Sequence, residues 1–292
     1  MKLSVLIPSR NELFVQQTIE DILKKATGEI EVIVFLDGYW PDPPLKENKR
    51  VHIIHSSIVR GMRGGVNACA AIAKGKYFMK CDAHCMFAEG FDEVLEADMQ
   101  DNFIVIPRRR SLNAELWAIN EKEPIDSEFI FYPYEHPDDL GLHARPWFER
   151  GRIMRDKNIT FYEDMSFQGS LWFMHRDHFL DRLGGLQEEG YGIFMGEPQE
   201  VGFKTQLGPW NGAIMRNTNT WYAHLHKGKQ YGRMYAMSNS SRKPGNAYSF
   251  DFWWHNRWTE RAHNLSWLIE KFWDQKIPTW PQDWRERHVD VY

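Results

Sequence analysis

The feature of this sequence that most restricts its fold is an alternation of short apolar runs with helical patterns between residues 2 and 81. Apolar runs with β character cover residues 2–7, 31–36, 51–55 and 77–81, and apolar residues recur at helical spacing from residue 15 to Gly28. We expect a small-residue helix over 66–73, after a glycine-rich turn at 61–65. Alternating strands and helices predict an α/β fold whose mostly parallel sheet is buried on both faces.

Length and composition restrict the chain further. Its 292 residues suit one large domain or a domain with an appendage, and a net charge of −4 provides no global field to attract nucleic acid or an anionic membrane. The N-terminal run is too short and too quickly polar for a signal peptide or membrane anchor. Three cysteines without paired zinc spacing favour a reducing, cytoplasmic setting.

Polar residues follow three of the predicted strands directly. Ser9, Asp37 and Asp82 each lie just past an apolar run. Ligands of such sheets bind beyond the carboxyl ends of the strands, so we expect these residues to share a site. In a strand, Asp82 and His84 would project to the same side and could hold a divalent cation. Alternatively, Asp82 opens a turn and His84 caps the strand end.

The order of these motifs resembles the nucleotide-sugar half of the GT-A glycosyltransferases, a Rossmann-like fold of family 2 type. The resemblance implies that Asp37 contacts the nucleoside and that Asp82 and His84 bind Mn²⁺ (or Mg²⁺) on the diphosphate. Taken singly, Asp37-Gly38 is equally a plain turn and residues 61–65 a loop. The motif positions that the resemblance implies in binding a nucleotide, expected to be a UDP-sugar, are Pro8, Ser9, Arg10, Glu12, Asp37, Arg63, Asn67 and Asp82.

Residues 168–179 and 192–204 are similar to the acceptor half of the polypeptide N-acetylgalactosaminyltransferases. The resemblance implies catalytic roles for Glu197 and Glu200, the alternative being a helix-capping carboxylate and a surface glutamate. Pro198 replaces the asparagine of that motif, Met195 replaces its first glycine, and the aspartate base of inverting enzymes is missing. Retention of the anomeric configuration is therefore favoured. The resemblance also implies acceptor or sugar contacts at Gly169, Trp172, Gly196 and Lys227.

A third metal ligand is expected after a strand-like run at 220–223. The resemblance places it at His224, followed by Lys227 at the family's spacing, with His226 in reserve. It covers about residues 3–228, so we expect a GT-A domain over 1–228. Residues 229–292 form an extension, in which a loop at 228–246 precedes a Trp-rich helical tail. The tail's aromatic residues either clamp it onto the domain or form a platform for a sugar or base.

The acceptor is left open by the sequence. We expect an amphipathic helix over 86–100, a strand at 103–107 and an irregular loop over 111–165, with basic residues at 108–110 and 145–157. These basic segments suggest a 5-hydroxymethylpyrimidine in DNA, modified by a bacteriophage enzyme in the host cytoplasm; a glycan or a protein is the alternative. The rival hypotheses are a non-catalytic sugar-nucleotide-binding module and, last, a structural zinc protein using Cys81 and Cys85.

Overall fold

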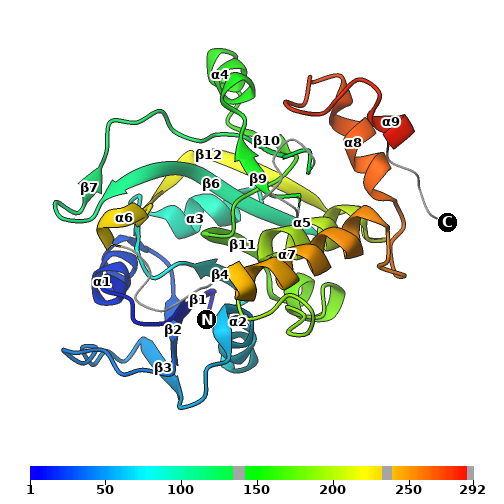
Figure 1. Ribbon diagram of the computed structural model, residues 1–292. Coiled ribbons are helices and arrows are strands. Elements are labelled where there is room, and N and C mark those ends of the chain that lie inside the picture. Colours follow the sequence, from blue (N-terminus) through cyan, green and yellow to red (C-terminus); the bar gives the residue numbers. More distant parts are fainter. Residues whose placement is uncertain (134–141, 232–238, 288–292) are drawn as a thin grey trace.

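A mixed β-sheet runs through the molecule in the strand order β10-β12-β6-β11-β4-β1-β2-β3 (Figure 1). The computed structural model describes residues 1–133, 142–231 and 239–287. Strands β1 to β4 are parallel, β11 is antiparallel to both of its neighbours, and β12 is parallel to β6. The strands on this path are β1 (Leu3–Ser9), β2 (Ile30–Asp37), β3 (Val51–Ser56), β4 (Tyr77–Cys81), β6 (Phe103–Asn113), β10 (Phe161–Asp164), β11 (Leu171–His175) and β12 (Ala213–His224).

Helices cover both faces of this sheet, as its apolar strands require. On one face, α1 and α3 pack against β1, β2 and β4; on the other, α2 and α5 pack against the same strands and β6. The α/β fold predicted from the sequence, with helices on both faces of the sheet, is confirmed. The helices are α1 (Val15–Lys25), α2 (Gly61–Ile72), α3 (Phe91–Ala97), α4 (Phe148–Asp156), α5 (Glu197–Leu207), α6 (Gly228–Tyr231), α7 (Asn239–Trp254), α8 (Leu265–Trp273), α9 (Trp284–Arg287) and the π-helical turn η1 (His178–Arg182).

Four local predictions were wrong. The supposed turn at 61–65 is the first part of α2, which begins at Gly61 because both oxygens of Asp37 accept backbone N–H groups there. Residues 86–100 divide into a short strand and α3. The supposed irregular stretch 111–165 contains α4 and several short strands, and its residues 134–141 lie outside the described part of the chain. In the supposed loop 228–246, residues 228–231 and 239–246 are helical, and residues 232–238 are not described. The shorter strands are β5 (Cys85–Phe87), β7 (Ala118–Ile119), β8 (Glu128–Ile130) and β9 (Ala144–Pro146).

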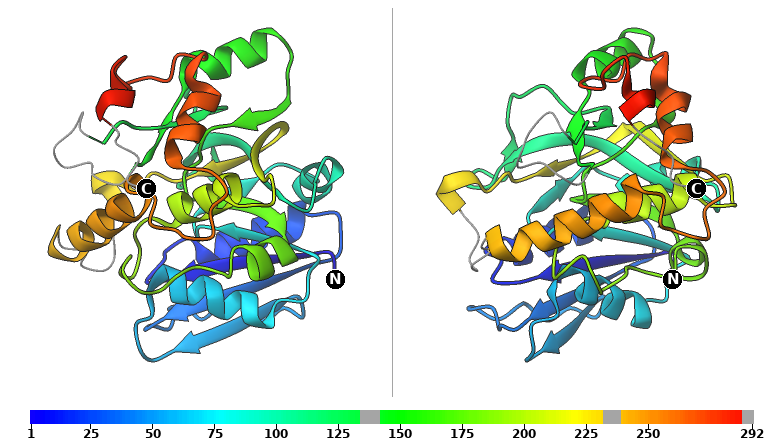
Figure 2. Two further views of the ribbon diagram at one scale, coloured as in Figure 1. Left: turned by 90° about the vertical axis from the view of Figure 1, so that its right-hand side faces the viewer. Right: turned by 45° about the vertical axis from the view of Figure 1, so that its right-hand side comes forward.

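Tryptophans of the C-terminal segment lie in an aromatic core that is separate from the cores on the two faces of the sheet. Trp253, Trp254, Trp280 and Trp284 are buried in a cluster that also takes in residues of β8, of α5 and of the loop before α4. In both views of Figure 2 the C-terminal helices lie against segments from the middle of the chain. Of the two interpretations of this tail, the structure supports the clamp. Among the helices described, none combines the length and apolarity needed to span a membrane.

Candidate active site

A cavity of about 400 Å³ opens at the carboxyl ends of the parallel strands. It brings together Pro8, Ser9, Arg10 and Glu12 from the end of β1, Asp37 from the end of β2, and the segment from Asp82 to His84 after β4. Gln168 and residues 224–228 complete its far wall. The sequence thus correctly anticipated the edge of the sheet at which these residues meet.

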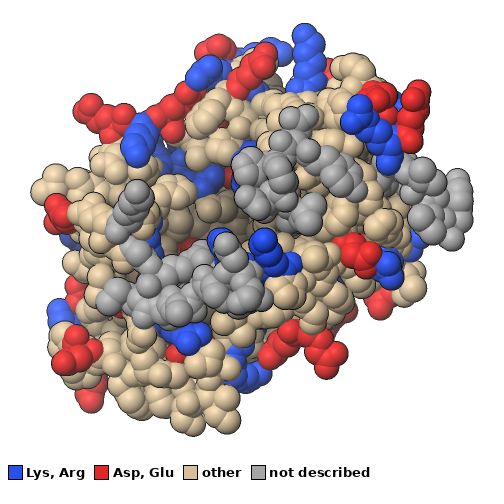
Figure 3. All heavy atoms as spheres, in the orientation of Figure 1, with Lys and Arg blue, Asp and Glu red and all other residues tan. Residues whose placement is uncertain are grey.

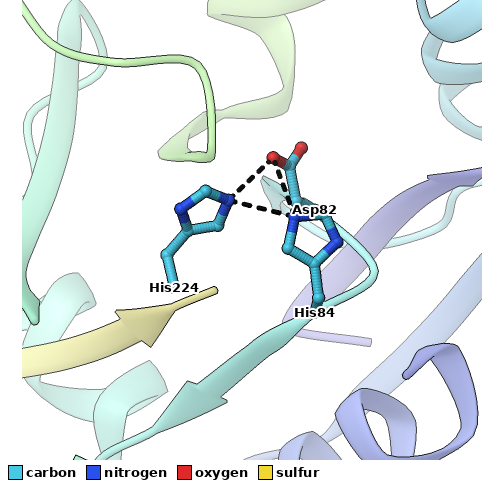
Figure 4. Close-up of side chains that lie close together, drawn as sticks. All are labelled: Asp82, His84 and His224. Carbon is cyan, nitrogen blue, oxygen red and sulfur yellow. Dashed lines mark hydrogen bonds and ion pairs between the residues drawn. The ribbon is translucent and has the colours of Figure 1, made fainter. Parts of the chain in front are cut away.

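Three of these side chains converge on one point (Figure 4). The ligand atoms of Asp82, His84 and His224 all lie within 4.8 Å of one another. His224 Nε2 is 3.2 Å from Asp82 Oδ2 and 3.1 Å from His84 Nε2. Burial lowers the pKa of His224 to about 3, so that its imidazole is neutral and offers a lone pair. One carboxylate oxygen and two imidazole nitrogens on one side of a cavity fit a divalent transition metal such as Mn²⁺.

Strand pairing explains how residues 140 positions apart meet. Strand β4 ends at Cys81, and Asp82 N–H donates to Ser170 O (2.9 Å) at the tip of β11. The chain then turns into β5, which pairs with β12 so that Cys85 lies opposite His224. Asp82 and His84 therefore lie on a turn between two strands, not on a single strand as the sequence had suggested.

The groups around this centre hold it in place. Glu12 Oε2 lies 3.2 Å from His84 Nδ1, and its other oxygen binds Lys227 Nζ (2.6 Å). Burial alone would raise the pKa of Glu12, but His84 and Lys227 outweigh this effect and lower it. A carboxylate at Nδ1 directs the Nε2 lone pair of His84 into the centre, an arrangement typical of metal-binding histidines.

Lys80 is a residue of this region that the sequence analysis missed. It is buried, and its Nζ lies 2.8 Å from Asp82 Oδ1 and 3.5 Å from Glu197 Oε2, with a further bond to the carbonyl of Gly169. Burial would raise the pKa of Asp82, but the Lys80 ammonium, His224 and His84 together outweigh burial and lower that pKa. The sequence feature that could have revealed Lys80 is its place inside an otherwise apolar central strand. A charge buried in such a strand must be paired, so its partners would be expected nearby.

Glu197 lies behind the cavity and does not line it. Its carboxylate accepts a hydrogen bond from Trp172 Nε1, and burial raises its pKa despite the nearby Lys80. A Cβ at Gly169 would overlap this carboxylate, and Gly196 adopts a left-handed conformation (φ 66°) against the Tyr191 ring. Glu197, Trp172, Gly169 and Gly196 are thus packed together, with no described side chain of this group among those that line the cavity.

Three further predicted residues have structural partners outside the cavity. Arg63 and Glu200 form a fully buried ion pair, and Arg63 also donates to the carbonyls of Gln187 (2.7 Å) and Met195 (2.9 Å). Asn67 donates to the carbonyl of Leu186 (2.8 Å). These contacts hold the segment before α5 against α2. They explain the residue types at these positions without a nucleotide.

The basic segments are largely neutralised by carboxylates. Arg108 pairs with Asp126 (2.6 Å), Arg109 with Glu128 (2.6 Å) and Arg150 with Asp164 (3.0 Å). Arg152 and Arg155 both pair with Glu123. On the face shown in Figure 3, Lys and Arg side chains are visible in and beside the central hollow, and side chains of both signs lie along the outer edge. These ion pairs leave the five arginines less available to a nucleic acid backbone, and the DNA acceptor expected from the sequence stays a prediction.

Comparison with known proteins agrees with this picture. The sequence model of a family described as "Glycosyl transferase family 2" matches residues 4–183, more than half of the chain. The "Uncharacterized glycosyltransferase EpsJ" of Bacillus subtilis (strain 168) is 23% identical over 192 residues, which are 56% of this chain and 54% of that protein.

The structure described as "Crystal structure of GalNAc-T7 with UDP, GalNAc and Mn2+" superposes with a TM-score of 0.67 at 17% identity. The match covers 98% of this chain and 58% of that one. The chain therefore spans little more than half the length of either protein. At this identity the structural likeness establishes the GT-A fold.

Proposed function

The chain belongs to glycosyl transferase family 2, and we propose that it transfers a sugar from a nucleotide-diphosphate donor to a hydroxyl group of an acceptor. The observation that carries this proposal is the convergence of Asp82, His84 and His224 in a cavity that also contains Ser9 and Asp37. We take the donor to be UDP-linked, because a protein of the same fold has been crystallised with UDP and Mn²⁺.

Asp82, His84 and His224 would hold the metal, which we take to be Mn²⁺. When bound, a divalent ion neutralises negative charge on a leaving diphosphate. Glu12 holds His84 with Nε2 facing the centre, and Lys80 keeps Asp82 ionised. Asp37 has a second role beside any nucleoside contact, because its carboxylate already caps α2.

We further propose retention of the anomeric configuration. The carboxylates that line the cavity are Glu12, Asp37 and Asp82, and each has partners described above. In retention, the acceptor oxygen bonds to the anomeric carbon on the side from which the phosphate oxygen leaves with the bonding electrons, and the acceptor proton passes to that departing oxygen. Glu197 is then a positioning residue. If the anomeric proton signal of the product shows inversion, His226, which lines the cavity with a lowered pKa, becomes the candidate base.

For the acceptor, we place a glycan or protein hydroxyl ahead of hydroxymethylated DNA. Arginines already paired with carboxylates release little free energy on binding phosphate, because the existing ion pairs must first be broken. The pairing of Arg108, Arg109 and Arg150 supports this order.

The test measures turnover of a panel of nucleotide sugars with Mn²⁺, read by mass spectrometry of the released nucleotide. We expect EDTA to abolish turnover and Mn²⁺ to restore it, and Asp82→Ala to lower it by at least about 100-fold, because a metal ligand is lost. Asp98→Ala, an exposed aspartate beyond α3, is the matched control and should keep wild-type activity. Full activity in EDTA would refute the metal assignment.

A further inference from the structure

Gln168 lines the cavity opposite the end of β1 and has no role in the function proposed above. Its side-chain oxygen accepts hydrogen bonds from Arg109 Nη1 and from Ser170 Oγ (3.2 Å). A guanidinium group can only donate, so the amide atom that faces Arg109 must be the oxygen. This contact fixes the orientation of the Gln168 amide, with Nε2 on the opposite side.

The groups that orient this amide are themselves fixed. Arg109 Nη2 donates to Glu128 Oε1 (2.6 Å). The other oxygen of Glu128 accepts from Arg216 (3.1 Å) and from the backbone N–H of Gln168 (3.3 Å). Ser170 Oγ in turn bonds to the hydroxyl of Tyr222 (2.7 Å). Arg109, Glu128, Arg216, Ser170 and Tyr222 are all buried, so the amide is held by a network that water does not reach.

The consequence is a preorganised donor in the cavity wall. Gln168 Nε2 carries two hydrogens, and no described residue accepts either of them. A backbone hydrogen bond fixes the position of this donor relative to Asp82. The carbonyl oxygen of Ser170, two residues after Gln168, accepts from the backbone N–H of Asp82 (2.9 Å). Gln168 therefore lies beside the proposed metal centre. In a nucleotide-diphosphate donor, the sugar is the group next to the diphosphate.

We propose that Gln168 Nε2 donates a hydrogen bond to an oxygen of the transferred sugar, either a hydroxyl or an acetamido carbonyl, and so selects among donor sugars. The inference rests on the function proposed above. It makes Gln168 a specificity-determining residue. A neutral amide can donate to a sugar oxygen or to a phosphate oxygen. Binding of UDP, which carries the phosphates without the sugar, distinguishes the two.

Gln168→Met tests this inference because methionine keeps the length of the side chain and removes the amide. Dissociation constants are measured in Mn²⁺ for UDP, for four UDP-sugars (glucose, galactose and their N-acetylamino forms) and for deoxy analogues lacking one oxygen each. We expect the affinity for UDP to stay within about twofold. The affinity for at least one UDP-sugar should fall about tenfold, the usual loss for one hydrogen bond.

That loss should disappear for the analogue that lacks the contacted oxygen, which a purely structural role for Gln168 would not produce. Gln275→Met is the matched control, because Gln275 also accepts from a buried arginine (Arg150 Nε, 2.6 Å) but lies away from the cavity. Should Gln168→Met fold poorly, Gln168→Glu keeps both oxygen contacts and removes the donor. Because its added charge acts on UDP and on every UDP-sugar alike, each sugar's loss is then taken relative to the variant's own affinity for UDP.

Failure of the wild-type protein to bind UDP with Mn²⁺ would refute the proposed function itself. If UDP binds, unchanged sugar affinities in the variant would overturn the inference about Gln168 alone. An equal loss for UDP and for every UDP-sugar would also overturn it.

Discussion

One buried lysine, Lys80, joins the carboxylates of Asp82 and Glu197 behind the cavity. Removing one member of a buried ion pair leaves an uncompensated charge and typically costs about 3–5 kcal/mol. Asp82 would then face Glu197 across the gap without a cation between them. Lys80 therefore supports the fold and favours the ionised form of Asp82, which the proposed metal site requires.

We expect Lys80→Met to lower the free energy of unfolding by about 3 kcal/mol or more, measured by urea titration. The double variant Lys80→Met/Glu197→Gln should recover part of that loss, because the second carboxylate is then neutral. Lys46→Met, which breaks an exposed pair with Glu20, should cost less than about 1 kcal/mol. Strictly additive losses in the double variant would contradict coupling through Lys80.

A buried histidine outside the candidate active site makes stability depend on pH. His178 Nε2 lies 2.9 Å from Thr205 Oγ1 within the core, and burial lowers its pKa to about 3. Below about pH 6.5 the unfolded chain binds a proton at this histidine that the folded chain does not. Stability is therefore lost as the pH falls from about 6.5 towards 3.

Between pH 7 and pH 5 this residue should account for about 2 kcal/mol, since pH 5 lies about 1.5 units below the unfolded pKa and each unit is worth about 1.4 kcal/mol. Other histidines also titrate, so the measured quantity is the difference between wild type and His178→Gln in urea unfolding at the two pH values. The variant should lose less stability than wild type on acidification. Equal losses would show that His178 is protonated in the folded protein.

At the scale of helices and strands, two arginine–glutamate pairs of different exposure join the beginning of α2 to α5 and to the segment that precedes α5. Arg63 and Glu200 are each 1% exposed, whereas Arg60 and Glu188 are 43% and 42% exposed. The two arginines lie at the beginning of the same helix and reach the same stretch of chain. Substituting each arginine in turn therefore measures how burial of an ion pair affects the free energy of unfolding.

Arg63→Met should lower the free energy of unfolding by about 3–5 kcal/mol, since it leaves Glu200 buried with Lys204 as its one cationic partner in the described part of the chain. Arg60→Met should cost less than about 1 kcal/mol, because the exposed pair is screened by solvent. Differential scanning calorimetry at neutral pH measures both. If Arg63→Met instead left stability unchanged and weakened UDP binding, the original prediction of a nucleotide contact at Arg63 would be correct.

The sequence predicted those parts of the fold and the site that depend on neighbouring residues, and missed those that depend on contacts between distant residues. The strands from β1 to β4 and the residues that follow them were found because buried parallel strands have continuous apolar runs. The start of α2 was missed because it depends on Asp37, 24 residues earlier, which caps the helix. The Lys80–Glu197 and Arg63–Glu200 pairs were missed for the same reason: they join residues 117 and 137 positions apart, and no local pattern reports such contacts.

At the scale of the whole molecule, the C-terminal helices and the sheet domain share one aromatic core. The cluster contains Phe129 and Trp147 from the middle of the chain, Phe203 from α5, and Trp253 and Trp280 from the tail. Trp280 Nε1 donates to the carbonyl of Ile130 (2.6 Å). A shared core of this kind predicts that tail and domain unfold together, in a single cooperative transition.

Trp280→Ala should therefore destabilise the entire protein, by about 3–5 kcal/mol, because it opens a cavity in this shared core and leaves the Ile130 carbonyl without its donor. Trp267→Ala, in α8 of the same tail but with 36% of its side chain exposed, should cost less than about 1 kcal/mol. Urea unfolding followed by tryptophan fluorescence and by far-ultraviolet circular dichroism distinguishes the possibilities. The two signals should coincide in wild type and shift together in Trp280→Ala. If fluorescence changed at lower urea than the backbone signal, the tail would be an independently unfolding unit, and its tryptophans would be free to serve a sugar or base as the platform that the sequence had also suggested.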